Sequence, residues 1–106
     1  MMDSSSVTLL PRYLEQIRSI IRSSMGDARG TVYLFGSRAR GNPRPTSDID
    51  LAVTVSGNTG SSIIASLREN LENSTIPFTV DVVDLGFCDS TLSDEVSREG
   101  VVVWNG

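Results

Sequence analysis

The chain has 106 residues and a net charge of −4, with 39% hydrophobic and 21% charged residues, which is typical of a single globular domain over residues 1–106. All nine basic residues are arginine, histidine and lysine are absent, and Cys88 is the only cysteine. These absences exclude disulfide frameworks, zinc fingers, histidine-dependent nucleophiles and the P-loop lysine. Carboxylates, arginines, hydroxyls and backbone amides must therefore carry any polar chemistry, and carboxylates favour hard ions such as magnesium.

The sequence also bears on location and partners. No apolar run reaches the length of a membrane-spanning helix, and the N-terminal residues lack the pattern of a secretory signal, so we expect a cytoplasmic protein with no membrane contact. The acidic balance argues against a nucleic-acid polymer as the main partner, although Arg38, Arg40 and Arg44 lie within seven positions of one another.

The first half of the chain predicts one helix and two strands. Residues 8–25 have the apolar spacing of an amphipathic helix, and Pro11 suits its first turn. Thr31 to Phe35 is a buried strand by its apolar, β-branched content. Residues 38–41 (RARG) predict a short helical turn and residues 41–47 (GNPRPTS) a loop. Asp48 to Val55 alternates as a strand with one aliphatic face.

The second half predicts two helices and two strands. Helices are expected at residues 62–73 and 90–99, and strands at residues 78–85 and 101–104. The predicted fold class is therefore α/β (α+β), a small sheet of about four strands with helices packed on it. Phe87, Cys88, Leu92 and Trp104 either form an apolar patch for a partner or close the core, and the core is the preferred assignment for Leu92 and Trp104.

Gly36 and Ser37 follow the first predicted strand. Glycine allows close approach of the backbone to a ligand, and a hydroxyl with successive amides at such a turn forms a small anion-binding cradle. Taken alone, the dipeptide is better explained as a turn that ends a strand.

Asp48 and Asp50 are two positions apart on a predicted strand, so their side chains share a face. Two carboxylates that lie this close to each other repel unless a cation lies between them. The small side chain of Ala52, next along this face, leaves room for a ligand. The alternative explanations are a polar outer face on a strand that is buried on one side only, or an aspartate that caps a helix.

Asp81 alternates with valines in the third predicted strand. Val80 and Val82 should face the core, so Asp81 should lie on the face that carries Asp48 and Asp50 if the strands are neighbours. Asp84 should face the other way, near the strand's end, with a structural or capping role. On its own, Asp81 is an ordinary exposed strand residue.

Taken together, these motifs resemble the nucleotidyltransferases with a DNA polymerase β-like palm, and among them the minimal nucleotidyltransferase (MNT) domains of prokaryotes. Gly36-Ser37, a ten-residue spacer, Asp48-Ile49-Asp50 and the later Asp81 carry the resemblance, which extends from about residue 31 to residue 85. It implies a small mixed sheet of the palm type. It also implies a magnesium-dependent transfer of a nucleoside monophosphate, AMP from ATP, onto a partner.

The resemblance also implies roles for individual residues. Asp48, Asp50 and Asp81 would be the catalytic carboxylates and would ligate two Mg²⁺ ions. The nucleotide-binding residues would be Gly36, Ser37, Arg38, Arg40 and Ser47, with Arg44 as a further candidate for neutralising the leaving pyrophosphate.

Larger relatives carry extra domains that bind the acceptor, and little sequence follows the fourth predicted strand. We therefore expect another protein to supply the acceptor. The family's usual partner is a HEPN-domain protein, the toxin of a toxin–antitoxin pair in which the MNT protein is the antitoxin. Two alternatives stand beside this hypothesis: a non-catalytic antitoxin that masks its HEPN partner, and a nucleotidyltransferase that modifies a small molecule such as an aminoglycoside.

Overall fold

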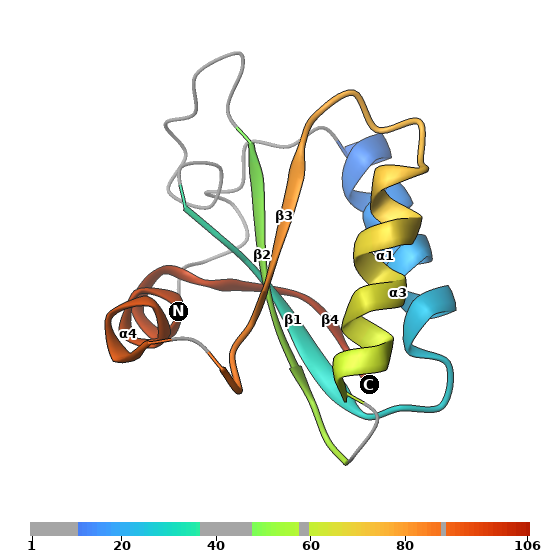
Figure 1. Cartoon of the computed structure of the whole chain (residues 1–106). Helices are drawn as coiled ribbons and strands as arrows, with labels where there is room; N and C mark the ends of the chain where they lie inside the picture. Colours follow the sequence, from blue (N-terminus) through green and yellow to red (C-terminus); the bar gives the residue numbers. More distant parts are fainter. Residues whose placement is uncertain (1–10, 37–47, 58–59, 88) are drawn as a thin grey trace.

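The computed structural model describes residues 11–36, 48–57, 60–87 and 89–106. It contains three helices and four strands in these ranges (Figure 1): α1 (Pro11–Met25), β1 (Gly30–Phe35), β2 (Ile49–Val55), α3 (Gly60–Glu72), β3 (Val80–Asp84), α4 (Ser90–Glu99) and β4 (Val101–Asn105). The predicted four-stranded sheet with packed helices is confirmed. Among the described helices, none has both the length and the apolar character needed to cross a bilayer.

The strands form one mixed sheet in the order β3-β2-β1-β4. β1 runs antiparallel to both of its neighbours, while β2 and β3 are parallel and are joined through α3. This arrangement leaves β3 at one edge of the sheet.

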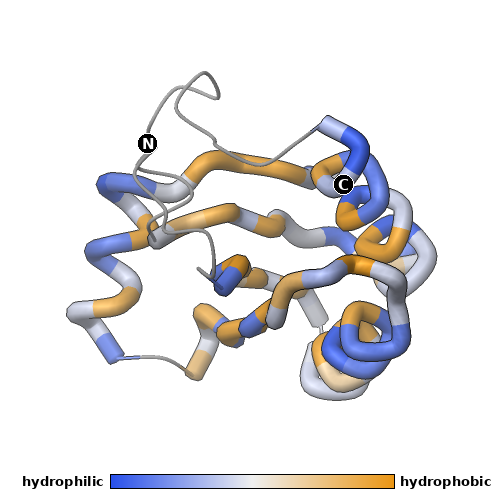
Figure 2. Tube along the Cα trace, turned by 90° about the horizontal axis from the view of Figure 1, so that it is seen from above, coloured by the Kyte–Doolittle hydropathy of each residue, from blue (hydrophilic) through white to orange (hydrophobic). Residues whose placement is uncertain are grey.

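Helices cover the two faces of the sheet unequally. Seen from above, the hydrophobic strands run between α4 on one side and α1 with α3 on the other (Figure 2). The main core lies on the α1 and α3 side, and its fully buried side chains come from α1, α3 and the sheet: Ile17, Ile21, Val32, Leu34, Ile49, Leu51, Val53 and Leu67. A smaller cluster of Phe35, Ala52 and Val96 lies under α4. The α4 side is therefore the thinner layer.

The helix and strand ends differ from the sequence prediction by a few residues. α3 begins at Gly60 rather than residue 62, and β3 is limited to Val80–Asp84 rather than residues 78–85. Phe78 precedes the strand, and its ring packs edge-on against Tyr13 of α1, with ring centroids 5.7 Å apart. The helix at residues 90–99 is confirmed, with Asp89 as its N-cap. Residues 8–10, the predicted turn at 38–41 and the loop at 41–47 lie outside the described residues.

Leu92 and Trp104 pack against the core clusters, which confirms the assignment preferred for them. Phe87 is 84% exposed, so it does not close the core. Cys88 lies outside the described residues.

Candidate active site

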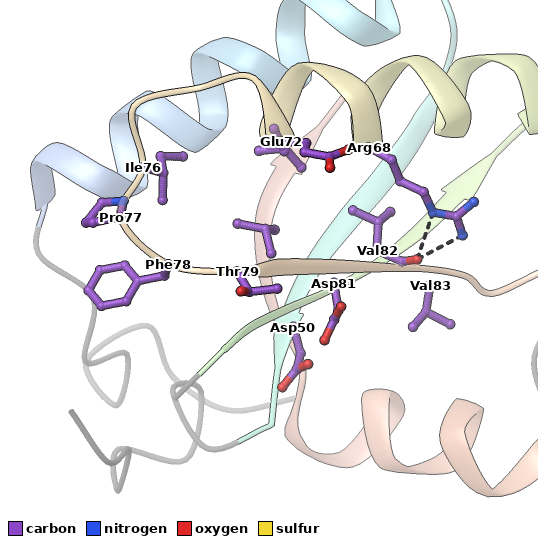
Figure 3. A pocket seen from close by; sticks show the side chains of 12 residues that line it. Asp50, Arg68, Glu72, Ile76, Pro77, Phe78, Thr79, Asp81, Val82 and Val83 are labelled. Atoms are coloured by element: carbon purple, nitrogen blue, oxygen red, sulfur yellow. Dashed lines mark hydrogen bonds between the residues drawn. The ribbon is translucent and has the colours of Figure 1, made fainter. Parts of the chain in front are cut away.

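Asp50 and Asp81 are direct register partners on the neighbouring parallel strands β2 and β3. Neighbouring strands lie about 4.8 Å apart, and side chains at paired positions point to the same face. Figure 3 shows both carboxylates on the side of β3 opposite Val82. Asp81 is exposed and Asp50 is half-buried. The expectation that Asp81 lies on the same face as Asp50, rather than in the interior, is confirmed.

Asp48 lies just before β2, in an exposed position. Strand alternation places it on the Asp50 face, but the residue that would oppose it across the sheet, Thr79, precedes β3 and is not an acid. Within the described ranges, no three acidic or thiol side chains lie close enough together to hold a metal ion. The structure thus brings together two of the three predicted carboxylates, and Asp48 stands beside this pair rather than within it.

Gly36 directly follows β1 and lies beside Asp50. Its φ of +78° lies in the left-handed region, where glycine is favoured. A Cβ atom at this position would lie 2.5 Å from Oδ2 of Asp50, closer than any ordinary contact. Glycine was expected here so that a ligand could approach the backbone, whereas the described contact is with the Asp50 carboxylate. Gly36 therefore makes room for Asp50.

Two neighbouring residues have structural roles. Ala52 was expected to leave room for a ligand, but this is wrong, because Ala52 is fully buried under α4 with Phe35 and Val96. Asp84 ends β3, and its Oδ1 accepts a hydrogen bond of 2.8 Å from the amide of Gly86. The structural role predicted for Asp84 is confirmed.

The remaining predicted nucleotide-binding residues, Ser37, Arg38, Arg40, Arg44 and Ser47, lie outside the described residues. Their assignment to the nucleotide stays a prediction.

A groove of about 890 Å³ joins the carboxylate pair to the outer edge of β3. Figure 3 shows that it runs from Asp50 and Asp81 past Thr79 to the α3–β3 connection. Its lining is partly apolar, through Ile76, Pro77 and Phe78. Sequence reasoning missed these residues, since three consecutive apolar or proline residues before a strand gave no sign that they border the acidic pair. The volume is in the range of small-molecule sites.

The donor set at this site suits a hard divalent cation. Carboxylate oxygens are the ligands that Mg²⁺ prefers, and both residues line the groove, Asp81 from the edge strand β3 and Asp50 from its neighbour β2. Asp50 and Asp81 are the residues that would hold the ion, with Asp48 two positions from Asp50. The described arrangement is therefore compatible with metal-assisted phosphoryl chemistry.

Comparisons with known proteins agree with this geometry. The family model "Polymerase beta, Nucleotidyltransferase" matches residues 15–106. A curated relative, protein adenylyltransferase MntA of Shewanella oneidensis, is 33% identical over 73 residues, which cover 69% of this chain and 52% of MntA. The chain thus matches about half the length of that relative.

Solved structures share the fold. A crystal structure of a toxin–antitoxin complex with AMP-PNP contains a chain with a TM-score of 0.72 and 28% identity, over 88% of this chain and 73% of that one. A structure described as a minimal nucleotidyltransferase matches with a TM-score of 0.57 and 26% identity, over 94% of this chain and 95% of the other.

Proposed function

Because this chain belongs to the polymerase beta nucleotidyltransferase family, we propose that it transfers AMP from ATP to a hydroxyl group of a partner protein. The partner is a HEPN-domain toxin, and this chain is its antitoxin. Mg²⁺ is the cofactor. The observation that carries the proposal is the direct pairing of Asp50 with Asp81 at an open sheet edge.

The relatives support the reaction and the partner. MntA is named a protein adenylyltransferase, and a similar chain was crystallised as part of a toxin–antitoxin complex with the ATP analogue AMP-PNP. Another similar structure, with a TM-score of 0.71 and 26% identity, is of an MntA toxin–antitoxin complex in which two aspartates two positions apart were changed to glutamate. Asp48 and Asp50 have the same spacing in this chain.

The reaction is an in-line substitution at phosphorus. The oxygen of the acceptor hydroxyl forms a bond to the α-phosphorus of ATP, the bond from that phosphorus to the bridging oxygen breaks, and pyrophosphate leaves. Bound Mg²⁺ supplies Lewis-acid stabilisation of the charge on the phosphate oxygens. The exposed carboxylate of Asp81 accepts a hydrogen bond from the acceptor hydroxyl and orients it, and the proton passes to solvent. Asp50, which lies between Gly36 and Asp81, would hold the Mg²⁺ ion on the side of the site away from the acceptor.

The position of Asp48 favours a second candidate function. Asp50 and Asp81 are paired directly, whereas Asp48 has no acidic partner opposite it, and the second candidate is that the chain neutralises its partner by masking alone. This candidate predicts the same complex but no transfer of AMP.

Labelled ATP distinguishes these candidates. The chain, Mg²⁺ and the co-expressed HEPN partner are incubated with ATP labelled either at the α- or at the γ-phosphorus. AMP transfer predicts that the partner acquires label from the α position only, and that Asp81→Asn abolishes the labelling. Unlabelled partner in a stable complex would favour masking, and label from the γ position would indicate a kinase.

A further inference from the structure

The outer edge of β3 presents backbone groups to the groove. The Thr79 carbonyl accepts from the Ile49 amide at 2.9 Å, and the Leu85 amide donates to the Val53 carbonyl at 3.0 Å. Peptide groups alternate along a strand, so those of Thr79, Asp81 and other odd-numbered residues face β2. Those of Val80, Val82 and Asp84 therefore face away from the sheet.

Two of these outward carbonyls already have partners. Arg68 of α3 donates two hydrogen bonds to the Val82 carbonyl, at 3.2 and 2.9 Å from its Nε and Nη2 atoms (Figure 3). The Asp84 carbonyl accepts from the Phe87 amide at 3.1 Å. Among the residues that the structure describes, neither the amide nor the carbonyl of Val80 has such a partner beyond the sheet edge. Val80 is thus the only residue in the described part of β3 whose outward amide and outward carbonyl are both available to pair with another strand.

This unit opens into the groove that contains the carboxylate pair. Val80, Asp81 and Asp50 all line it, as do Pro77 and Phe78 at the end near the α3–β3 connection. A chain segment that paired with Val80 would therefore continue the row of strands at the point where the two aspartates lie.

Resting on the proposed function, we infer that the acceptor protein presents its hydroxyl on an extended segment that pairs with Val80 as an additional strand. Register then fixes the position of the hydroxyl. The incoming residue opposite Asp81 has its side chain on the same face of the sheet as Asp81 and Asp50. It lies about 4.8 Å from Asp81, on the side away from β2. A serine, threonine or tyrosine at that position lies beside the carboxylates. Its neighbours on either side lie on the opposite face, toward Arg68 and Glu72 of α3.

The geometry of β3 favours a short acceptor segment over a second copy of this chain. β3 has only five residues, and Arg68 already occupies the Val82 carbonyl, so an uninterrupted ladder between two β3 edges cannot form. Because only Val80 offers both an outward amide and an outward carbonyl, about three residues of an acceptor segment can pair with β3. A segment of that length is enough to place a single hydroxyl.

Amide exchange measured by NMR tests this inference. The residue that wild-type protein labels with AMP is first mapped, and a synthetic peptide of about eleven residues centred on it is the probe. We expect the Val80 amide to exchange freely in the free protein and at least tenfold more slowly with saturating peptide. The adjacent Asp81 amide, which faces β2, is the internal control and should be protected in both states. Unchanged exchange at Val80 with bound peptide would overturn the inference. Protection that grows with protein concentration alone would also overturn it, in favour of a second copy.

Two variants of Val80 give an independent kinetic test. Val80→Pro removes the outward amide, and proline is tolerated where an edge-strand amide faces away from the sheet. It should raise the KM for the peptide about fivefold or more, with the KM for ATP changed less than twofold. Val80→Ala removes the same side chain but keeps the amide, so the peptide KM of Val80→Pro should exceed that of Val80→Ala by about fivefold or more. Equal KM values for all three proteins would refute strand pairing, and if Val80→Pro does not fold, the exchange measurement decides. Absence of any AMP-labelled protein with the wild type would instead refute the proposed function itself.

Discussion

Replacing Gly36 with alanine tests how the site holds Asp50. The new Cβ atom would lie 2.5 Å from Oδ2 of Asp50, whereas a carbon and an oxygen in contact need roughly 3.3 Å. The carboxylate must therefore move by roughly 0.8 Å. Because misplacement by about 1 Å can reduce a rate about 100-fold, we expect kcat/KM for AMP transfer to fall by about 10- to 100-fold.

Gly26→Ala is the matched control for this change. Gly26 also has a left-handed conformation, with φ of +56°, but a Cβ atom there would meet nothing within 4 Å. Both variants incur the cost of a side chain in that region, about 1–2 kcal/mol, which corresponds to a fall in Tm of about 4–16 °C. Only Gly36→Ala moves a carboxylate of the site.

The assay measures transfer of α-labelled AMP to the partner at a temperature well below both Tm values, with the Tm of each variant measured in parallel. We expect similar losses of stability and very different activities. If both variants keep wild-type activity, or both lose it equally, the contact between Gly36 and Asp50 does not position the carboxylate.

Three further predictions concern stability. Asp81→Asn should stabilise the metal-free protein by about 0.2–1 kcal/mol, since it removes a like-charge pair across neighbouring strands, and a lower Tm in EDTA would contradict this. Asp89→Ala should cost about 0.5–2 kcal/mol in urea denaturation, because it removes the 2.8 Å bond from the Leu92 amide that caps α4, and an unchanged midpoint would show that the cap contributes nothing. Ala52→Leu should cost about 1–3 kcal/mol by overpacking the cluster under α4, and a variant as stable as wild type would mean that α4 yields easily.

The local pattern of the sequence was enough to predict the face of each strand. Alternation in residues 48–55 and 78–85 correctly separated Asp50 and Asp81 from the aliphatic core, because strand periodicity depends only on neighbours in the chain. The helix at residues 90–99 could also be predicted from local signals, since acidic residues lie early in it, Arg98 lies late and Gly100 follows it.

The environment of each face could not be predicted in the same way. Ala52 has the same orientation as Asp50, yet α4 covers only Ala52, and that contact depends on how a helix some forty residues later crosses the sheet. The edge position of β3 and the groove beside it likewise follow from the strand order, which no local pattern encodes. The contact between Gly36 and Asp50 arises from the antiparallel pairing of β1 with β2.

The central claim, that Asp50 and Asp81 together hold a metal–nucleotide complex, is tested most directly by calorimetric titration of Mg²⁺ and AMP-PNP. The proteins compared are wild type, Asp81→Asn and Asp84→Asn. Asp84 lies on the same strand but on the opposite face, and asparagine there keeps the oxygen that accepts from Gly86. We expect Asp81→Asn to weaken binding at least about tenfold, the loss of about 1.4 kcal/mol, and Asp84→Asn to bind as wild type does. Equal affinity in all three proteins would contradict the claim.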